Sequence, residues 1–191
     1  MILVVFATPP ENPFDVHLEK GIVAPHEGKL LLLAGMGVRA AERLATALAA
    51  HPEATGVLEF GGAAAVSGAG PGEYYSIART FFPDGVPATA ISPVAGLPRA
   101  AAVCGDEIYR GGGFAWSAAA GMPLLYTMET LSLHEVCRRR NLPFRSIRLV
   151  TDDGRGDLSK NYRAALAAAR ETTTVLIDAA TLPLVAGSLS S

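Results

Sequence analysis

The chain has 191 residues, 50% of them hydrophobic, and a net charge of −2 from 16 Lys and Arg against 18 Asp and Glu residues. This length and composition predict one domain with a sizeable core, spanning residues 1–191. The balanced charge argues against nucleic acid as a partner, because phosphate binding needs clustered basic residues. No stretch is long and apolar enough to predict a membrane span. We therefore expect a cytoplasmic protein.

Short apolar runs alternate with helical patterns along the chain. The predicted strands cover residues 2–7, 30–34, 56–60, 74–80, 101–104 and 144–150. The predicted helices cover residues 38–50, 128–139 and 161–171. Nearly continuous aliphatic runs are typical of strands that are covered on both faces. Strands that alternate with helices predict a layered α/β fold with a mostly parallel sheet.

The first run, residues 1–7, lacks the basic lead and cleavage site of a signal peptide, so it is predicted to be a buried strand. The two cysteines, Cys104 and Cys137, are too few for a disulfide framework, and no Cys/His spacing predicts zinc. We therefore expect neither a metal nor another cofactor.

Two carboxylates lie at element boundaries beside apolar residues, where a charge is costly unless it is used. Glu129 is at the start of a predicted helix, and Asp152 follows a predicted strand. Ligands of open α/β sheets gather at the carboxyl ends of the strands. A polyhydroxylated ligand could bind in a crevice between these two residues, and a carboxyl group there could donate a proton to it.

The same region resembles the nucleoside phosphorylase and nucleosidase superfamily. The resemblance rests on YTMET at residues 126–130, LHEVC at 133–137, LPF at 142–144 and IRLVTD at 147–152. The family pattern is Met-Glu opening a helix, then Val-Pro-Phe, a strand and Ser-Asp. The nearest branch contains the methylthioadenosine/S-adenosylhomocysteine nucleosidases and futalosine hydrolases. The resemblance implies a three-layer α/β/α sandwich with a mixed, mostly parallel central sheet.

The resemblance also implies roles for three carboxylates. Asp152, beside Thr151, matches the aspartate that protonates the leaving purine, and a turn aspartate is the alternative. Glu129 would accept hydrogen bonds from the ribose hydroxyls, with Met128 packing on the sugar; a first-turn glutamate that complements the helix dipole is the alternative. Glu11, shortly after the first strand, aligns with the glutamate that activates water, although an exposed loop glutamate explains it equally well.

Weaker parts of the resemblance supply the rest of the expected substrate site. Gly37 and Gly61 lie in glycine-rich segments that match the family turns near the sugar. Ile108 occupies the position of the aromatic residue that stacks on the base, so Tyr109, Phe114 or Trp116 could supply the stacking ring instead.

The arginines that related phosphorylases use for phosphate are missing after the first strand and at the third, which favours water as the nucleophile. The expected activity is hydrolysis of the N-glycosidic bond of a 5′-modified purine nucleoside. A phosphorylase and a non-catalytic nucleoside-binding module remain alternatives. The segment between Glu11 and the strand at residue 30 is short, so we expect a homodimer in which the partner subunit completes the pocket.

Overall fold

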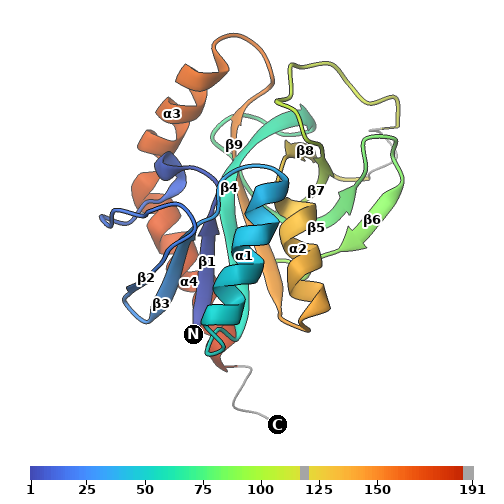
Figure 1. Ribbon diagram of the computed structural model, residues 1–191. Coiled ribbons are helices and arrows are strands. Elements are labelled where there is room, and N and C mark those ends of the chain that lie inside the picture. The colour runs from blue at the N-terminus through green and yellow to red at the C-terminus, as the bar shows by residue number, and fades with distance from the viewer. Residues whose placement is uncertain (117–120, 187–191) are drawn as a thin grey trace.

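The computed structural model of the protein describes residues 1–116 and 121–186 and contains a mixed β-sheet with helices on both faces (Figure 1). The strands are β1 (Ile2–Phe6), β2 (Val23–His26), β3 (Lys29–Leu33), β4 (Gly56–Ser67), β5 (Tyr74–Phe81), β6 (Pro87–Ala90), β7 (Arg99–Cys104), β8 (Leu124–Thr127) and β9 (Phe144–Asp152). The helices are the short 3₁₀ turn η1 (Pro9–Glu11), α1 (Val38–Ala50), α2 (Thr130–Arg139), α3 (Leu158–Ala168) and α4 (Arg170–Ala186).

The sheet order is β2-β3-β1-β4-β8-β7-β5-β6, and β9 pairs with both β4 and β5. Parallel pairings join β1 to β3 and β4, β4 to β9, and β7 to β5 and β8. Antiparallel pairings join β2 to β3, β8 to β4, and β5 to β6 and β9. The sheet therefore curls until β4, β8, β7, β5 and β9 close into a ring. The predicted α/β class with a mixed, mostly parallel sheet is confirmed.

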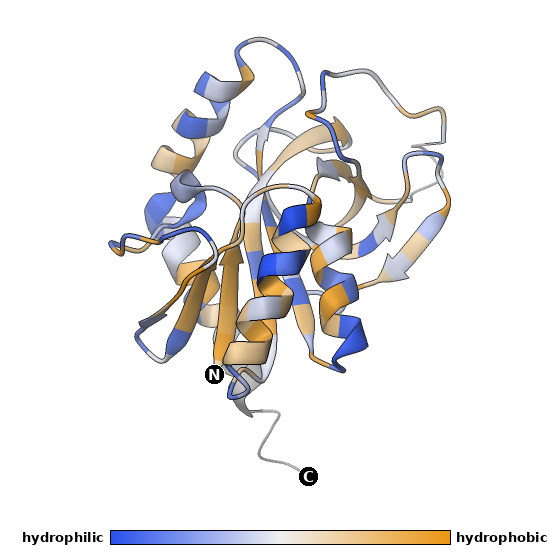
Figure 2. Cartoon of the chain, in the orientation of Figure 1, coloured by the Kyte–Doolittle hydropathy of each residue, from blue (hydrophilic) through white to orange (hydrophobic). Residues whose placement is uncertain are grey.

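Each face of the sheet has its own hydrophobic core. Leu3 and Val5 of β1 pack with α1 and α2, whereas Ile2, Val4 and Phe6 pack on the other face with α3 and α4. This alternation is the two-residue period of a strand, and it explains why β1 is apolar throughout. Figure 2 shows the same arrangement, with hydrophobic colour along the central strands and hydrophilic residues on the helices in front of them.

Most predicted strand boundaries differ from the structure by one or two residues, and three elements differ in ways that affect the site or the fold. The third strand does not end at Phe60 but continues to Ser67, because its small residues pair with β9 and β8. The second helix begins at Thr130 rather than Met128, so Glu129 is its N-cap. The last predicted helix is two helices, α3 and α4, which meet at Ala169. The loop over residues 83–98 also contains the edge strand β6.

Candidate functional site

A cavity of about 500 Å³ opens where the carboxyl ends of β1, β8 and β9 meet. It brings together Glu11, Glu129 and Asp152, which lie far apart in the sequence. The remaining lining residues are Ala7, Thr8, Pro9, Pro10, Met36, Gly62, Ala63, Ala64, Ile108, Tyr109, Tyr126, Thr127, Met128, Thr151, Leu158, Ser159, Tyr162 and Arg163. Most of this wall is apolar, and Glu11, Glu129 and Asp152 are its acidic residues.

Glu11 is turned into the cavity by the short turn that follows β1. Pro9 and Pro10 occupy the first positions of η1, where a backbone N–H has no partner within the turn and a fixed φ is favourable. The chain then folds back, and Glu11 becomes buried with 3% of its surface exposed. The two prolines therefore build the turn that carries the carboxylate.

Each carboxylate oxygen of Glu11 accepts two hydrogen bonds. Oε2 accepts the backbone N–H groups of Ala7 at 2.7 Å and Thr8 at 2.9 Å. Oε1 accepts the N–H of Gly62 at 3.0 Å and the hydroxyl of Tyr162 at 2.6 Å. These donors fix the carboxylate in one orientation.

Burial raises the pKa of Glu11 above its ordinary value, and this effect outweighs the opposing hydrogen bond from Tyr162 and the charge of Arg148. Desolvation penalises the ionised form of a carboxyl group, while donors and nearby cations favour it. A carboxylate whose pKa is raised is a stronger base than an exposed glutamate, which suits it to accept a proton from water.

Glu129 faces the same cavity from the N-terminus of α2. It is 5% exposed, and its Oε1 accepts the N–H of Gly37 at 3.4 Å, a long hydrogen bond. Burial raises its pKa to about 7; Arg148 lowers the pKa, and Glu11 and Glu59 raise it further. Its oxygens are therefore available to donors on a ligand.

Asp152 and Thr151 reach the cavity together because of an irregularity in β9. The pairing with β4 shifts between Ala63 and Ala64, so that Ala63 pairs with Val150 and Ala64 with Asp152. Such a bulge re-aims side chains that would otherwise alternate. Asp152 Oδ2 lies 2.8 Å from the Thr151 hydroxyl, and Oδ1 accepts the N–H of Gly154 at 2.8 Å. Asp152 thus supports a turn, as one interpretation expected, and also lines the cavity.

Aromatic rings form the far end of the cavity. Tyr109 stacks on Tyr126 with centroids 5.2 Å apart, and both rings line the cavity beside Ile108. Phe114 stacks on Tyr109 with a centroid distance of 6.4 Å and packs with Trp116. Neither Phe114 nor Trp116 lines the cavity. Of the rings considered from the sequence, Tyr109 is the one placed to contact a planar base.

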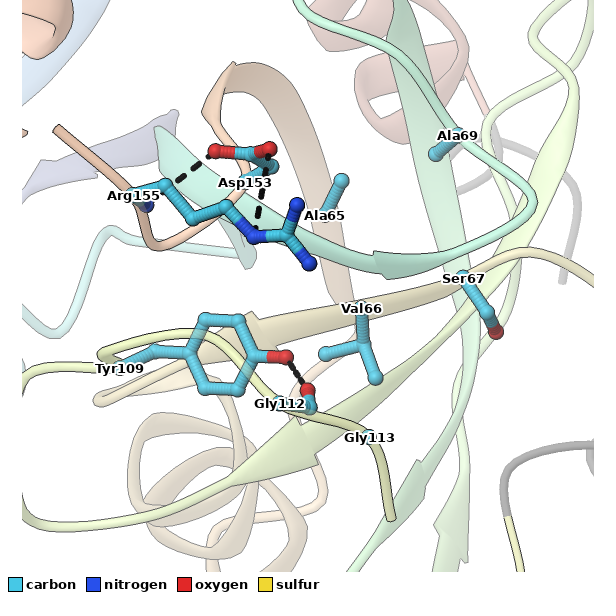
Figure 3. Close-up of a pocket in the computed structure, with 9 residues that line it drawn as sticks. All are labelled: Ala65, Val66, Ser67, Ala69, Tyr109, Gly112, Gly113, Asp153 and Arg155. Carbon is cyan, nitrogen blue, oxygen red and sulfur yellow. Dashed lines mark hydrogen bonds and ion pairs between the residues drawn. The ribbon is translucent and has the colours of Figure 1, made fainter.

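Tyr109 also lines a second, smaller cavity of about 300 Å³, which is shown in Figure 3. Figure 3 shows its hydroxyl directed at the carbonyl of Gly112, and Asp153 facing Arg155, with a separation of 4.0 Å between Oδ2 and Nε. Both charged residues are exposed. Asp153, the neighbour of Asp152, therefore points into a different space.

The glycines singled out from the sequence support the site from behind. Gly37 donates to Glu129, as above, but does not line the cavity. Gly61 lies under the carboxylate: a Cβ there would overlap Arg148 Nη1 and lie 2.9 Å from Glu11 Oε1. Its neighbour Gly62 is the one that lines the cavity. The sequence indicated this segment correctly, although it is a stretch of β4 rather than a turn, and the residue that faces the cavity is Gly62 rather than Gly61.

Three important residues were missed. Tyr162 of α3 lines the cavity and donates to Glu11. Arg148 of β9 and Glu59 of β4 form a buried ion pair below it, and Arg148 also donates to the Thr130 hydroxyl at 2.6 Å. A lone charge within an apolar strand was an available signal for this pair, since a buried charge needs a partner. Nothing local in the sequence marks Tyr162.

Neither a metal-binding cluster nor a membrane-spanning helix is found in residues 1–116 and 121–186. No group of three or more His, Cys, Asp or Glu side chains in these ranges is arranged to hold a metal ion. No helix within them is sufficiently long and apolar to cross a membrane.

No protein-family model and no curated protein sequence matches the chain. Solved structures do. A futalosine hydrolase mutant of Helicobacter pylori superposes with a TM-score of 0.74 at 15% identity, over 94% of this chain and 97% of the other. The chain therefore has the same fold as this hydrolase. The 5′-methylthioadenosine nucleosidase of Arabidopsis thaliana matches with a TM-score of 0.71 at 19% identity, over 93% and 94% of the two chains.

A third structure is the 5′-methylthioadenosine/S-adenosylhomocysteine nucleosidase of S. pneumoniae with a transition-state inhibitor, at a TM-score of 0.68 and 17% identity, over 93% and 96%. The resemblance noted in the sequence is therefore confirmed for the nucleosidase fold across nearly the whole chain.

Proposed function

We propose that the protein is an N-ribosyl hydrolase that cleaves the N-glycosidic bond of a 5′-modified purine nucleoside. The observation that carries the proposal is the meeting of Glu11, Glu129 and Asp152 in one apolar cavity. The fold shared with methylthioadenosine nucleosidase and futalosine hydrolase supports the choice of substrate class.

Each carboxyl group has a role in the proposed reaction. Asp152 donates a proton to the purine as the bond to the anomeric carbon breaks and its electron pair passes to the base. Glu129 accepts hydrogen bonds from the ribose hydroxyls and holds the sugar while positive charge develops on it. A water molecule attacks the anomeric carbon and gives its proton to Glu11. Proton donation to the leaving group and proton removal from the nucleophile are the two general acid–base steps of the reaction.

The charges around the cavity favour water over phosphate. Three carboxyl groups line it, and within the described residues Arg163 is the one arginine that does so. Arg148 is 1% exposed and engaged by Glu59, and Arg39 is exposed on α1 away from the cavity. Phosphate is bound by converging cations and backbone donors, and nearby carboxylates repel it.

Release of free base should therefore not depend on phosphate. Purified protein is incubated with methylthioadenosine, S-adenosylhomocysteine and futalosine-type nucleosides, with and without phosphate, and the products are separated by chromatography. We expect equal rates and free ribose derivatives in both conditions. A ribose-1-phosphate product would establish a phosphorylase, and tight binding without any product would establish a binding module.

We further propose a homodimer with the cavity near the subunit boundary. Two residues that line the cavity carry large apolar side chains in contact with solvent: Met36 is 54% exposed and Ile108 55%. Val38, two residues after Met36 at the start of α1, is 67% exposed. Apolar surface beside a site is a typical place for a partner. Light scattering at micromolar concentration tests this, and a fully active monomer would contradict it. The cytoplasmic location expected from the sequence is likewise a proposal, which cell fractionation can check.

The aromatic side chains of β5 and the residue after it, Tyr74, Tyr75, Phe81 and Phe82, do not form an exposed patch that could supply this interface. Tyr75 and Phe81 are buried in the core. Tyr74 is half-buried, and its hydroxyl bonds to the Ala169 carbonyl and the Thr173 hydroxyl. Only Phe82 of that set is exposed. Internal packing therefore accounts for Tyr74, Tyr75 and Phe81.

A further inference from the structure

The side chain of Tyr162 connects α3 to the proposed base. Its hydroxyl donates to Glu11 Oε1 at 2.6 Å and lies 2.7 Å from the Thr8 hydroxyl. The other three donors to Glu11 are backbone N–H groups, from Ala7, Thr8 and Gly62. Within the described part of the chain, Tyr162 is therefore the one side chain that holds this carboxylate.

The ring of Tyr162 fits only because residue 62 is glycine. A Cβ at Gly62 would lie 2.5 Å from Tyr162 Cε2 and 3.0 Å from Thr151 Cγ2, closer than van der Waals contact allows. The missing side chain of β4 thus leaves the space that the ring occupies. A hydroxyl from α3 reaches Glu11 across the space that this glycine leaves open.

We propose that Tyr162 is a positioning residue. It orients the Glu11 carboxylate and keeps it ionised, so that Glu11 can take a proton from the water that attacks the sugar. The inference rests on the proposed hydrolase function and assigns a residue to it that no motif identifies. Glu11 remains the group that touches the reacting water, and Tyr162 acts through it.

A hydroxyl can serve both states of the base, unlike a backbone N–H, which can only donate. With Glu11 ionised, Tyr162 donates to Glu11, and Thr8 donates to Tyr162. Once Glu11 has taken the proton from water, the chain can reverse: Glu11 donates to Tyr162, and Tyr162 donates to Thr8. The contacts of 2.6 and 2.7 Å permit both directions.

Other charged groups face Glu11 and must be considered in any pH experiment. They are Glu59 of β4, Arg148 and Asp152 of β9, Glu129 at the N-terminus of α2, and Arg163 of α3. Glu129 titrates near neutrality in the free protein. Ribose hydroxyls hold Glu129 ionised in the complex, so the acid limb of kcat at saturating substrate reports Glu11 rather than Glu129.

The test is the pH dependence of kcat for Tyr162→Phe, which removes one oxygen and keeps the ring over Gly62. Loss of a donor to an ionised carboxylate raises its pKa, so more of Glu11 is protonated and inactive at a given pH. We expect the acid limb to move to higher pH and kcat at neutral pH to fall by about tenfold, with KM nearly unchanged.

Tyr74→Phe is the matched control. Its hydroxyl also makes two partly buried hydrogen bonds, to Ala169 and Thr173 in the helical layer, but none to the site. The control should lose comparable stability without a shift in the acid limb. Gly62→Ala should displace the Tyr162 ring and so weaken the hydrogen bond from Tyr162 to Glu11. It should therefore shift the acid limb of kcat in the same direction as Tyr162→Phe.

Two results separate failure of this inference from failure of the proposed function. Absence of base release by the unaltered protein would remove the hydrolase itself. An active parent enzyme, with an acid limb that stays in place in Tyr162→Phe, would overturn the positioning role alone. A shift of equal size in Tyr74→Phe would do the same, because it would reveal a general effect of lost stability.

Discussion

Asp152→Asn is expected to lower kcat by about 10²–10⁴-fold, the usual contribution of a general acid. Without the donated proton the purine leaves as an anion, which is a poor leaving group. Asparagine is nearly isosteric, and its carbonyl oxygen can still accept the N–H of Gly154, which Asp152 accepts at 2.8 Å. The turn after β9 should therefore survive, so nucleoside binding by calorimetry should remain close to that of the parent protein.

The matched control for this variant is Asp153→Asn. Asp153 is the next residue, carries the same carboxyl group and faces the neighbouring cavity with Arg155 (Figure 3). Its replacement should leave kcat within a small factor of the parent value. A near-normal rate for Asp152→Asn would return Asp152 to a purely structural role in the turn. An equal loss in both variants would indicate damage to the loop instead of loss of the acid.

The sequence was sufficient to predict the site residues that local patterns mark. Glu129 and Asp152 were found because each lies at the end of an element, where apolar periodicity stops and a charge follows. Glu11 was identified through the family resemblance, which places a glutamate shortly after the first strand. The sequence could not place Gly62 in the cavity rather than Gly61, because the face of a strand is set by register, and small residues give little information about register. The same residues resembled a turn, so the length of β4 was underestimated.

Tyr162 could not be found from local pattern because its contact with Glu11 spans 151 residues. It lies in an alanine-rich helix where a tyrosine could equally face solvent. Its role depends on a missing Cβ at Gly62, and a missing atom has meaning only once the two elements are packed together. The ion pair of Arg148 and Glu59, separated by 89 residues, has the same origin. Local patterns thus indicated the proposed reaction, whereas only tertiary packing brings together Tyr162 with Glu11 and Arg148 with Glu59.

Glu129→Gln is expected to abolish most of the preference for ribonucleosides over their 2′-deoxy analogues. The ionised carboxylate offers both oxygens to the vicinal hydroxyls, and its present partner, the N–H of Gly37, is 3.4 Å away. A 2′-deoxy substrate leaves a buried acceptor unpaired, which costs ~1–3 kcal/mol, or about 5- to 150-fold in affinity. Glutamine keeps one acceptor and presents an amide donor in place of the other, so it loses this discrimination. Glu135→Gln, a change on α2 at a partly exposed residue that does not line the cavity, is the control.

The pH dependence of binding checks the same role independently. Burial raises the pKa of Glu129 to about 7, so the carboxyl group is increasingly protonated as the pH falls below neutrality. A protonated group loses acceptor capacity, and ribonucleoside affinity should therefore decrease as the pH falls through 7. Calorimetry in an Asp152→Asn background measures this without turnover, and adding Glu129→Gln should flatten the profile. Equal affinity for ribo- and 2′-deoxyribonucleosides in the parent protein, together with a flat profile, would exclude Glu129 as the ribose acceptor.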